Sequence, residues 1–179
     1  MGVAASWQAA GTTPLAVLLA AIGGGSALFH LRATAATQLA DIIPIGVFQL
    51  TYAGGYLRRA MGRSRTVALA WLLLFVAALL VTAQLPQRLN GSLAYLPAAL
   101  ALVMIGLAHY RVASSARERL LDAAALFALA LALRTVDHAL CAQWPSGTHW
   151  AWQVLNALVL YLAIAGLDDR PVNRLRASS

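Results

Sequence analysis

The feature that most constrains the fold is a series of six apolar segments separated by short polar breaks. The segments are predicted as helices at residues 12–33, 38–58, 66–84, 92–111, 119–141 and 147–167. A helix of about 20 apolar residues crosses the hydrocarbon core of a bilayer. Charged residues make up only 11% of the chain, whereas soluble domains carry about 25%. We therefore expect an all-α, polytopic transmembrane bundle of six spans, forming one domain over residues 1–179 with a polar tail at 168–179.

The arginines indicate how this bundle is oriented. Ten of them fall in breaks on one predicted side of the membrane, namely Arg58, Arg59, Arg63, Arg65, Arg111, Arg117, Arg119, Arg170, Arg174 and Arg176. Arg32 and Arg88 lie on the other side. Basic residues accumulate in cytoplasmic loops, so both termini are predicted to be cytoplasmic. The net charge of +7 is thus a topology signal, and we expect no nucleic-acid partner. Basic residues that are all arginine, in a chain rich in alanine and leucine, suggest a bacterial inner-membrane protein.

With this orientation, polar residues from four helices are predicted at a similar depth in the outer leaflet. The first helix runs outward toward His30, and the second begins near Asp41 at the same surface. The fifth helix ends near Asp137, and the sixth begins at His149. The full set is Ser26, His30, Asp41, Asp137, His149 and Gln153. Polar groups in hydrocarbon are costly and commonly mark function, so this set is the candidate site.

The residues of this set also have simpler interpretations, and for a histidine near a helix end, such as His30 or His149, it is a place at the membrane interface. Ser26 could bond to the backbone of its own helix. Asp41 could cap the start of the second helix. Asp137 could be neutralised by Arg134, one turn before it. These alternatives stay open for each residue taken alone, but independent caps and ion pairs need not lie at one depth.

The neighbouring aromatic and glycine residues have structural interpretations. Trp144, Trp150 and Trp152 are typical of an aromatic belt at the membrane surface. The three glycines at 23–25 favour close packing between helices.

Taken together, the polar residues fit a zinc site. His30 and His149 supply the imidazole nitrogens that zinc prefers. A carboxylate such as Asp41 can orient or deprotonate a zinc-bound water. Ser26, one turn from His30, can donate a hydrogen bond to an oxyanion or a substrate carbonyl.

At these residues the sequence resembles the alkaline ceramidase family, within the wider superfamily that includes the adiponectin and progestin receptors. The first matching segment reads "GGGSALFHLRATAATQLADIIPI" and contains a Ser, a His four residues later and an Asp eleven further. The second reads "RTVDHALCAQWPSGTHWAWQ" and contains an Asp and a Cys, then a loop and a helix that begins with His. The resemblance covers most of the chain in helix order.

The resemblance implies a membrane-embedded, zinc-dependent hydrolase of a ceramide-like sphingolipid, in which a metal-bound water attacks the amide carbonyl. The membrane lipid would be its substrate. His30, His149 and Gln153 would be at the metal, with Gln153 where the family has its third histidine. Asp41 would orient the water or act as general base, and Ser26 would bind the oxyanion or substrate. Asp137 would support the ligands without touching the metal.

Two departures from the family leave alternatives open. An amide oxygen is a poorer zinc ligand than imidazole, so Gln153 should weaken metal binding. The chain also begins near the family's second helix, without the first helix and its acidic calcium-binding residues. One alternative is a lipid-binding descendant without catalysis and with a degenerate metal site. Another is a small transporter in which Asp41 and Asp137 relay protons or cations.

Overall fold

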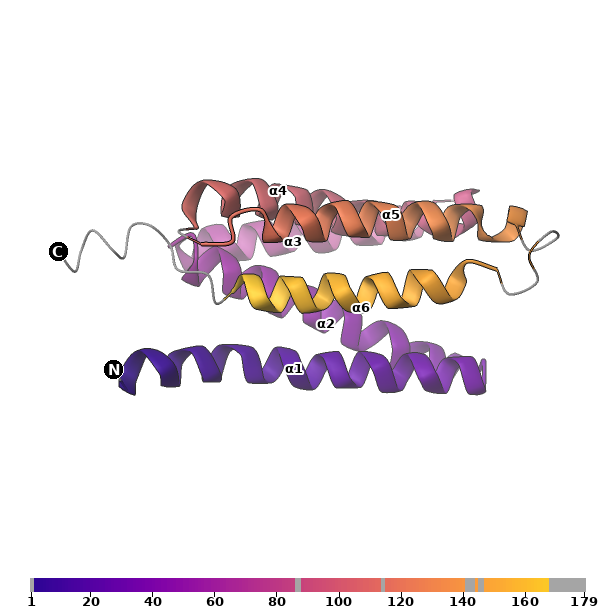
Figure 1. Cartoon of the computed structure of the whole chain (residues 1–179), viewed down its shortest axis with the longest axis horizontal. Helices are drawn as coiled ribbons and strands as arrows, with labels where there is room; N and C mark the ends of the chain where they lie inside the picture. Colours follow the sequence, from indigo (N-terminus) through magenta and orange to yellow (C-terminus); the bar gives the residue numbers. More distant parts are fainter. Residues whose placement is uncertain (1, 86–87, 114, 141–143, 145–146, 168–179) are drawn as a thin grey trace. The chain divides into compact units, whose positions relative to one another are not determined.

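The computed structural model describes residues 2–85, 88–113, 115–140, 144 and 147–167 of the chain, and this part is helical (Figure 1). No strand occurs among the described residues, which confirms the all-α class. The elements are α1 (Gly2–Leu31), α2 (Ala35–Arg59), α3 (Arg65–Ala83), the 3-10 helix η1 (Arg88–Tyr95), α4 (Leu96–Val112), α5 (Arg119–Leu140) and α6 (His149–Gly166). The predicted C-terminal tail at 168–179 lies outside the described residues.

Four segments are long and apolar enough to cross a membrane, which indicates a multi-pass membrane protein. They are Thr13–Leu31, Arg65–Ala83, Leu89–Val112 and His149–Gly166. The other two predicted spans correspond to α2 and α5. These helices contain the ionisable residues Asp41, Arg134 and Asp137, and such residues lower the hydropathy of a helix.

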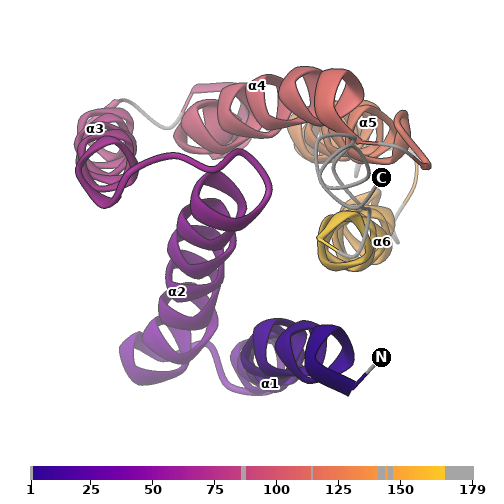
Figure 2. The same ribbon diagram turned by 90° about the vertical axis from the view of Figure 1, so that its left-hand side faces the viewer.

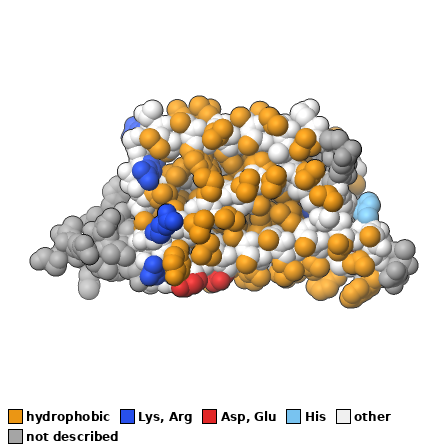
Figure 3. All heavy atoms as spheres, turned by 90° about the horizontal axis from the view of Figure 1, so that it is seen from above, with side chains coloured by type: hydrophobic (Ala, Val, Ile, Leu, Met, Phe, Trp, Pro, Cys, Tyr) orange, Lys and Arg blue, Asp and Glu red, His pale blue; other side chains and the backbone are white. Residues whose placement is uncertain are grey.

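The outer surface of the helices carries large apolar side chains. Leu31 is 80% exposed, Leu74 70% and Val81 66%. On the face seen in Figure 3, hydrophobic side chains form a broad surface and arginines gather near one end. Contiguous apolar surface of this kind marks contact with lipid or with other proteins, in agreement with an integral membrane protein.

Two helix starts differ from the sequence prediction. The fourth helix begins at Leu96 rather than at residue 92, because η1 precedes it. Within η1, Leu89, Asn90 and Gly91 have left-handed backbone with φ of 53°, 53° and 74°, which an α-helix cannot continue through. The first helix begins at Gly2 rather than at residue 12.

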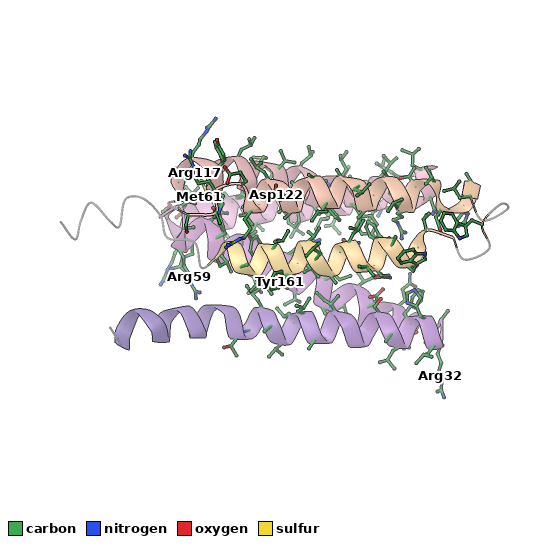
Figure 4. All side chains as sticks on the ribbon, in the orientation of Figure 1. Arg32, Arg59, Met61, Arg117, Asp122 and Tyr161 are labelled. Carbon is green, nitrogen blue, oxygen red and sulfur yellow. The ribbon has the colours of Figure 1, made fainter. Side chains whose placement is uncertain are left out.

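The chain divides into two compact units, Met1–Leu72 and Leu73–Ser179, and the boundary falls within α3. We call them the first and the second unit and describe each by itself. In the first unit α2 slants across α1 (Figure 2). Arg32 lies at one end of α1, and Arg59 lies at the far end of α2 (Figure 4).

The closest approach of α1 and α2 depends on a glycine facing a backbone carbonyl. Pro44 has no N–H, so the carbonyl of Ala40 lacks the helical donor that a residue at 44 would otherwise supply. Gly25 packs against this carbonyl, and a Cβ at Gly25 would lie 2.1 Å from the Ala40 oxygen. Gly23 and Gly24 have nothing within 4 Å of a Cβ position. Of the three glycines at 23–25, only Gly25 therefore makes the close contact.

The second unit has an aromatic and aliphatic core. Its buried members are Ala123, Phe127, Ala130, Trp152 and Val159. Trp152 is only 5% exposed and packs edge-on against Tyr95, with ring centroids 5.1 Å apart. Its assignment to a surface aromatic belt was therefore wrong. Trp144 and Trp150 are 58% and 59% exposed, as a belt requires.

Gly25→Ala should destabilise the first unit, because the added methyl group meets the Ala40 backbone and the helices must move apart. Overpacking of this kind costs about 1–3 kcal/mol. Thermal unfolding of the detergent-solubilised protein, followed by circular dichroism, measures the change. Gly24→Ala is the matched control, and it should leave stability unchanged or raise it, since Ala exceeds Gly in helix propensity by about 1 kcal/mol. Equal melting of the two variants would contradict the packing argument.

Candidate functional site

In the first unit, His30 is fixed by its own helix. Its Nδ1 lies 2.8 Å from the backbone carbonyl oxygen of Ser26, one turn earlier. A carbonyl can only accept, so Nδ1 carries the proton and donates it. In the neutral ring the lone pair is then on Nε2, the nitrogen that can bind a metal. His30 therefore has the tautomer that ligation requires.

Asp41 does not cap α2. The cap is Thr34, whose side chain accepts a hydrogen bond from the backbone N–H of Thr37, while the Thr37 side chain accepts one from the Thr34 N–H. Asp41 lies about two turns further into the helix, so the interpretation of this residue as a helix cap was wrong. A Cβ on Gly25 would lie 3.0 Å from the Asp41 nitrogen. The crossing thus places the α1 turn of Ser26 against the α2 turn of Asp41.

In the second unit, the carboxylate of Asp137 holds the start of α6. Its Oδ1 accepts a hydrogen bond from the backbone N–H of Thr148 at 2.5 Å, and the Thr148 hydroxyl lies 3.1 Å away. The same hydroxyl donates to the carbonyl of Leu133 at 2.7 Å. Asp137 and Thr148 are both buried. Asp137 thereby fixes the residue that immediately precedes His149.

His149 and Gln153 lie side by side on α6. The two Nε2 atoms are 3.4 Å apart. Two ligand atoms of one tetrahedral zinc ion are separated by a similar distance, about 3.3 Å. The Gln153 amide would have to turn by half a rotation to present its oxygen, because an amide nitrogen is a donor and not a ligand. With that rotation, the pair fits one edge of a metal site.

The Arg134 side chain packs on aromatic rings. Its guanidinium carbon lies 5.1 Å from the centre of the Tyr95 ring and 5.3 Å from that of the Trp152 ring. Asp137 has its hydrogen bonds to Thr148 instead. The simple interpretation in which Arg134 neutralises Asp137 therefore finds no support in these contacts.

The segment η1 packs against the last turns of α5 through side-chain hydrogen bonds. The Asn90 amide donates to the carbonyl of Arg134 at 2.7 Å. The Thr135 hydroxyl lies 2.8 Å from the Ser92 hydroxyl oxygen. Irregular backbone at membrane depth is tolerated where it is buried in protein. These hydrogen bonds hold η1 against α5.

The predicted site residues thus form two groups, one in each unit. The first unit contains Ser26, His30 and Asp41, and the second contains Asp137, His149 and Gln153. His138 is exposed whereas its neighbour Asp137 is buried, so the two side chains lie on different sides of α5. In the described part of the chain, no three His, Cys, Asp or Glu side chains gather as a metal site. Neither group alone supplies a full ligand set.

The sequence did not single out Thr148 or Tyr95. Thr148 follows a glycine at a loop end, which is typical of a helix cap, but its bond to Asp137 depends on how α5 and α6 pack. Tyr95 lies just before α4 and gave no signal of its contact with Arg134.

No protein-family model, curated protein or solved structure matches the chain. The resemblance to alkaline ceramidases therefore stays a prediction from the two sequence segments.

Asp137→Ala should destabilise the second unit, because it leaves the buried Thr148 N–H without its acceptor. A buried donor left unsatisfied costs about 1–3 kcal/mol, measurable by thermal unfolding in detergent. Asp122→Ala on the same helix is the control; Asp122 is exposed in the first turn (Figure 4), where an acid contributes about 0.3–1 kcal/mol. Asp137→Asn keeps an accepting oxygen and should retain part of the stability. An Asp137→Ala protein that melts like the control would refute this role.

Proposed function

We propose that the protein is a membrane-embedded, zinc-dependent hydrolase that cleaves the amide bond of a ceramide-like lipid. The single observation that carries the proposal is the pair of neighbouring side chains His149 and Gln153, with Nε2 atoms 3.4 Å apart. Their spacing suits two ligands of one ion, and Asp137 fixes the helix start from which they project.

The metal ligands in this proposal are His30, His149 and Gln153. The Nδ1 bond of His30 to its own helix backbone leaves Nε2 as the basic nitrogen, which supports ligation. A bound zinc ion would supply a Lewis acid and lower the pKa of water to about 7. Gln153 would make binding weaker than three histidines do, because the amide oxygen is a weaker donor than imidazole.

The roles of Ser26 and Asp41 follow from the chemistry of amide hydrolysis. Water adds to the carbonyl carbon, the C–N bond breaks, and the departing nitrogen takes up a proton. Asp41 is the group proposed to accept a proton from water and deliver it to that nitrogen. Ser26 would donate a hydrogen bond to the carbonyl oxygen as negative charge develops there. The products are a fatty acid and an amine.

The site is proposed to lie in a protein with six spans and cytoplasmic termini, in a bacterial inner membrane. In the first unit Arg58 and Arg59 lie in the last turn of α2, and in the second unit Arg117 precedes α5 and Arg119 is its first residue. This pattern supports the orientation, since basic loops stay in the cytoplasm. Spanning by α2 and α5 is part of the same proposal.

A lipid-binding protein without catalysis is the second candidate. It is favoured by Gln153, which directs its amide nitrogen toward His149 and would bind no metal in that rotamer. Zinc content separates the two candidates.

His30→Ala and His149→Ala should each lower zinc content at least about tenfold. Residues that only hydrogen-bond to a zinc ligand already contribute about 10- to 100-fold to zinc affinity, and a direct ligand should contribute at least as much. Elemental analysis of the purified protein after zinc loading and gel filtration measures this. His138→Ala is the matched control, because His138 is exposed and lies on a different side of α5 from Asp137, and it should retain zinc. Gln153→His should raise occupancy.

The same four variants are then assayed for release of fatty acid from ceramide. Turnover should fall with zinc in the first two variants and persist in His138→Ala. Zinc-free protein that binds ceramide without hydrolysis would favour the second candidate. Turnover that survives both His30→Ala and His149→Ala would rule out the proposed chemistry.

A further inference from the structure

Arg134 is a cation within α5, and the contacts among the described residues pair it with no carboxylate. It lies in α5, one turn before Asp137. Its Nε atom is buried and has no hydrogen-bond partner among the residues that the structure describes. Asp137, the nearest acid along the helix, bonds to Thr148. The side chain as a whole is half-buried, and a donor of a charged group that is removed from water without a partner is unfavourable, so a further partner for Arg134 is expected.

The two rings around Arg134 limit how that partner can approach. Tyr95 and Trp152 lie 5.1 Å apart with their planes inclined by 69°, and the guanidinium carbon is 5.1 and 5.3 Å from their centres. Rings attract the flat faces of a guanidinium. The N–H groups point outward in its plane, where they can form paired hydrogen bonds to two oxygens of one group. The arrangement therefore suits a flat or tetrahedral oxyanion that approaches the edge of Arg134.

The other side chains near Arg134 are polar but uncharged, so they are compatible with a polar ligand and form no ion pair with Arg134. Asn90 donates its amide to the Arg134 carbonyl, and Ser92 and Thr135 bond to each other through their hydroxyls. None of these three side chains carries a charge. Leu89 and Asn90 adopt left-handed backbone, a strained conformation that occurs often at functional sites.

We propose that Arg134, packed against both Tyr95 and Trp152, binds the oxyanion of a lipid. The oxyanion is either a phosphate in the headgroup or a free carboxylate. A lipid is the chemically apt source because Arg134 lies within a helix of a membrane protein, and the large apolar side chains of Leu129 and Val136 on the same helix are exposed. This lipid-binding proposal deepens the proposed function. It rests on that function only where it treats the bound lipid as the substrate or the product. A bound phosphate would make the substrate an anionic lipid, and a bound carboxylate would make Arg134 a binding site for the fatty-acid product.

The test measures lipid binding by the full-length protein in a neutral detergent, with two pairs of probes. Dioleoyl phosphatidic acid is compared with dioleoylglycerol for the phosphate, and oleate is compared with oleyl alcohol for the carboxylate. We expect the wild type to bind the charged member of at least one pair at least about tenfold more tightly, as charge-assisted hydrogen bonds imply. The pair that shows the preference identifies the source of the oxyanion.

Arg134→Gln should abolish this preference without weakening the neutral member of the pair. Arg134→Lys keeps the charge but loses the planar set of donors, so it should retain only part of the preference. Arg117→Gln is the matched control, since Arg117 also packs on a ring, that of Tyr110 at 4.4 Å, but lies exposed before the start of α5 (Figure 4). It should bind like the wild type.

Two results would overturn the proposal. One is a wild-type protein that binds charged and neutral members of both pairs alike, a result that holds whether or not the variants fold. The other is an Arg134→Gln protein that melts like the wild type and keeps the full preference. Binding is measured without zinc or turnover, so failure here leaves the hydrolase proposal untouched. A protein that lacks zinc can still show the Arg134-dependent preference.

Discussion

In the hydrocarbon of a bilayer, a backbone N–H or C=O without a partner costs several kcal/mol. Regular helical bonding is interrupted at several described places, among them Pro14 in α1 and Pro44 in α2, and a specific contact lies at three of them. Gly25 packs against the Ala40 carbonyl, which Pro44 leaves without its helical donor. Asp137 accepts from the N–H of Thr148 at the start of α6. The polar residues of the candidate site lie beside these points, so the same contacts that complete the backbone also position the functional groups.

The third place is η1, where Asn90 bonds to the carbonyl of Arg134. This segment brings Tyr95 onto the guanidinium, while Asp137 is bound elsewhere. Asp137 and Arg134 lie one turn apart on α5, and each is thus stabilised by other partners rather than by an ion pair between them. Such an arrangement keeps Asp137 as a fixed support for α6, and it leaves the buried Nε of Arg134 without a hydrogen-bond partner among the described residues.

Much of the fold could be predicted from sequence because membrane helices are determined by composition and length. Helix ends were predicted within a few residues, except at the start of the first helix, which begins at Gly2 rather than at residue 12. The candidate residues could be found because polar groups are rare in such segments. Their partners could not. That Thr148 bonds to Asp137, or that Trp152 is buried rather than in the surface belt, depends on side-chain packing between α5 and α6, which sequence spacing does not encode.

The same distinction applies to the capping of α2. Asp41 had the right chemistry and position for a cap, but Thr34 and Thr37 bond reciprocally and begin the helix earlier. Asp41 is thereby left as an acid within the helix rather than at its end. Carboxylates in such positions are costly, and the role proposed for this one in proton transfer gives it a reason to be there.

The central claim is that one zinc ion binds through both His30 and His149. Each group of site residues contains a single one of these imidazoles, so counting imidazoles around the metal tests the claim most directly. X-ray absorption at the zinc edge provides that count for the purified, zinc-loaded protein. The account predicts two imidazole nitrogens at about 2.0–2.1 Å, with oxygen completing the shell. A shell with one imidazole, or with oxygen alone, would contradict it.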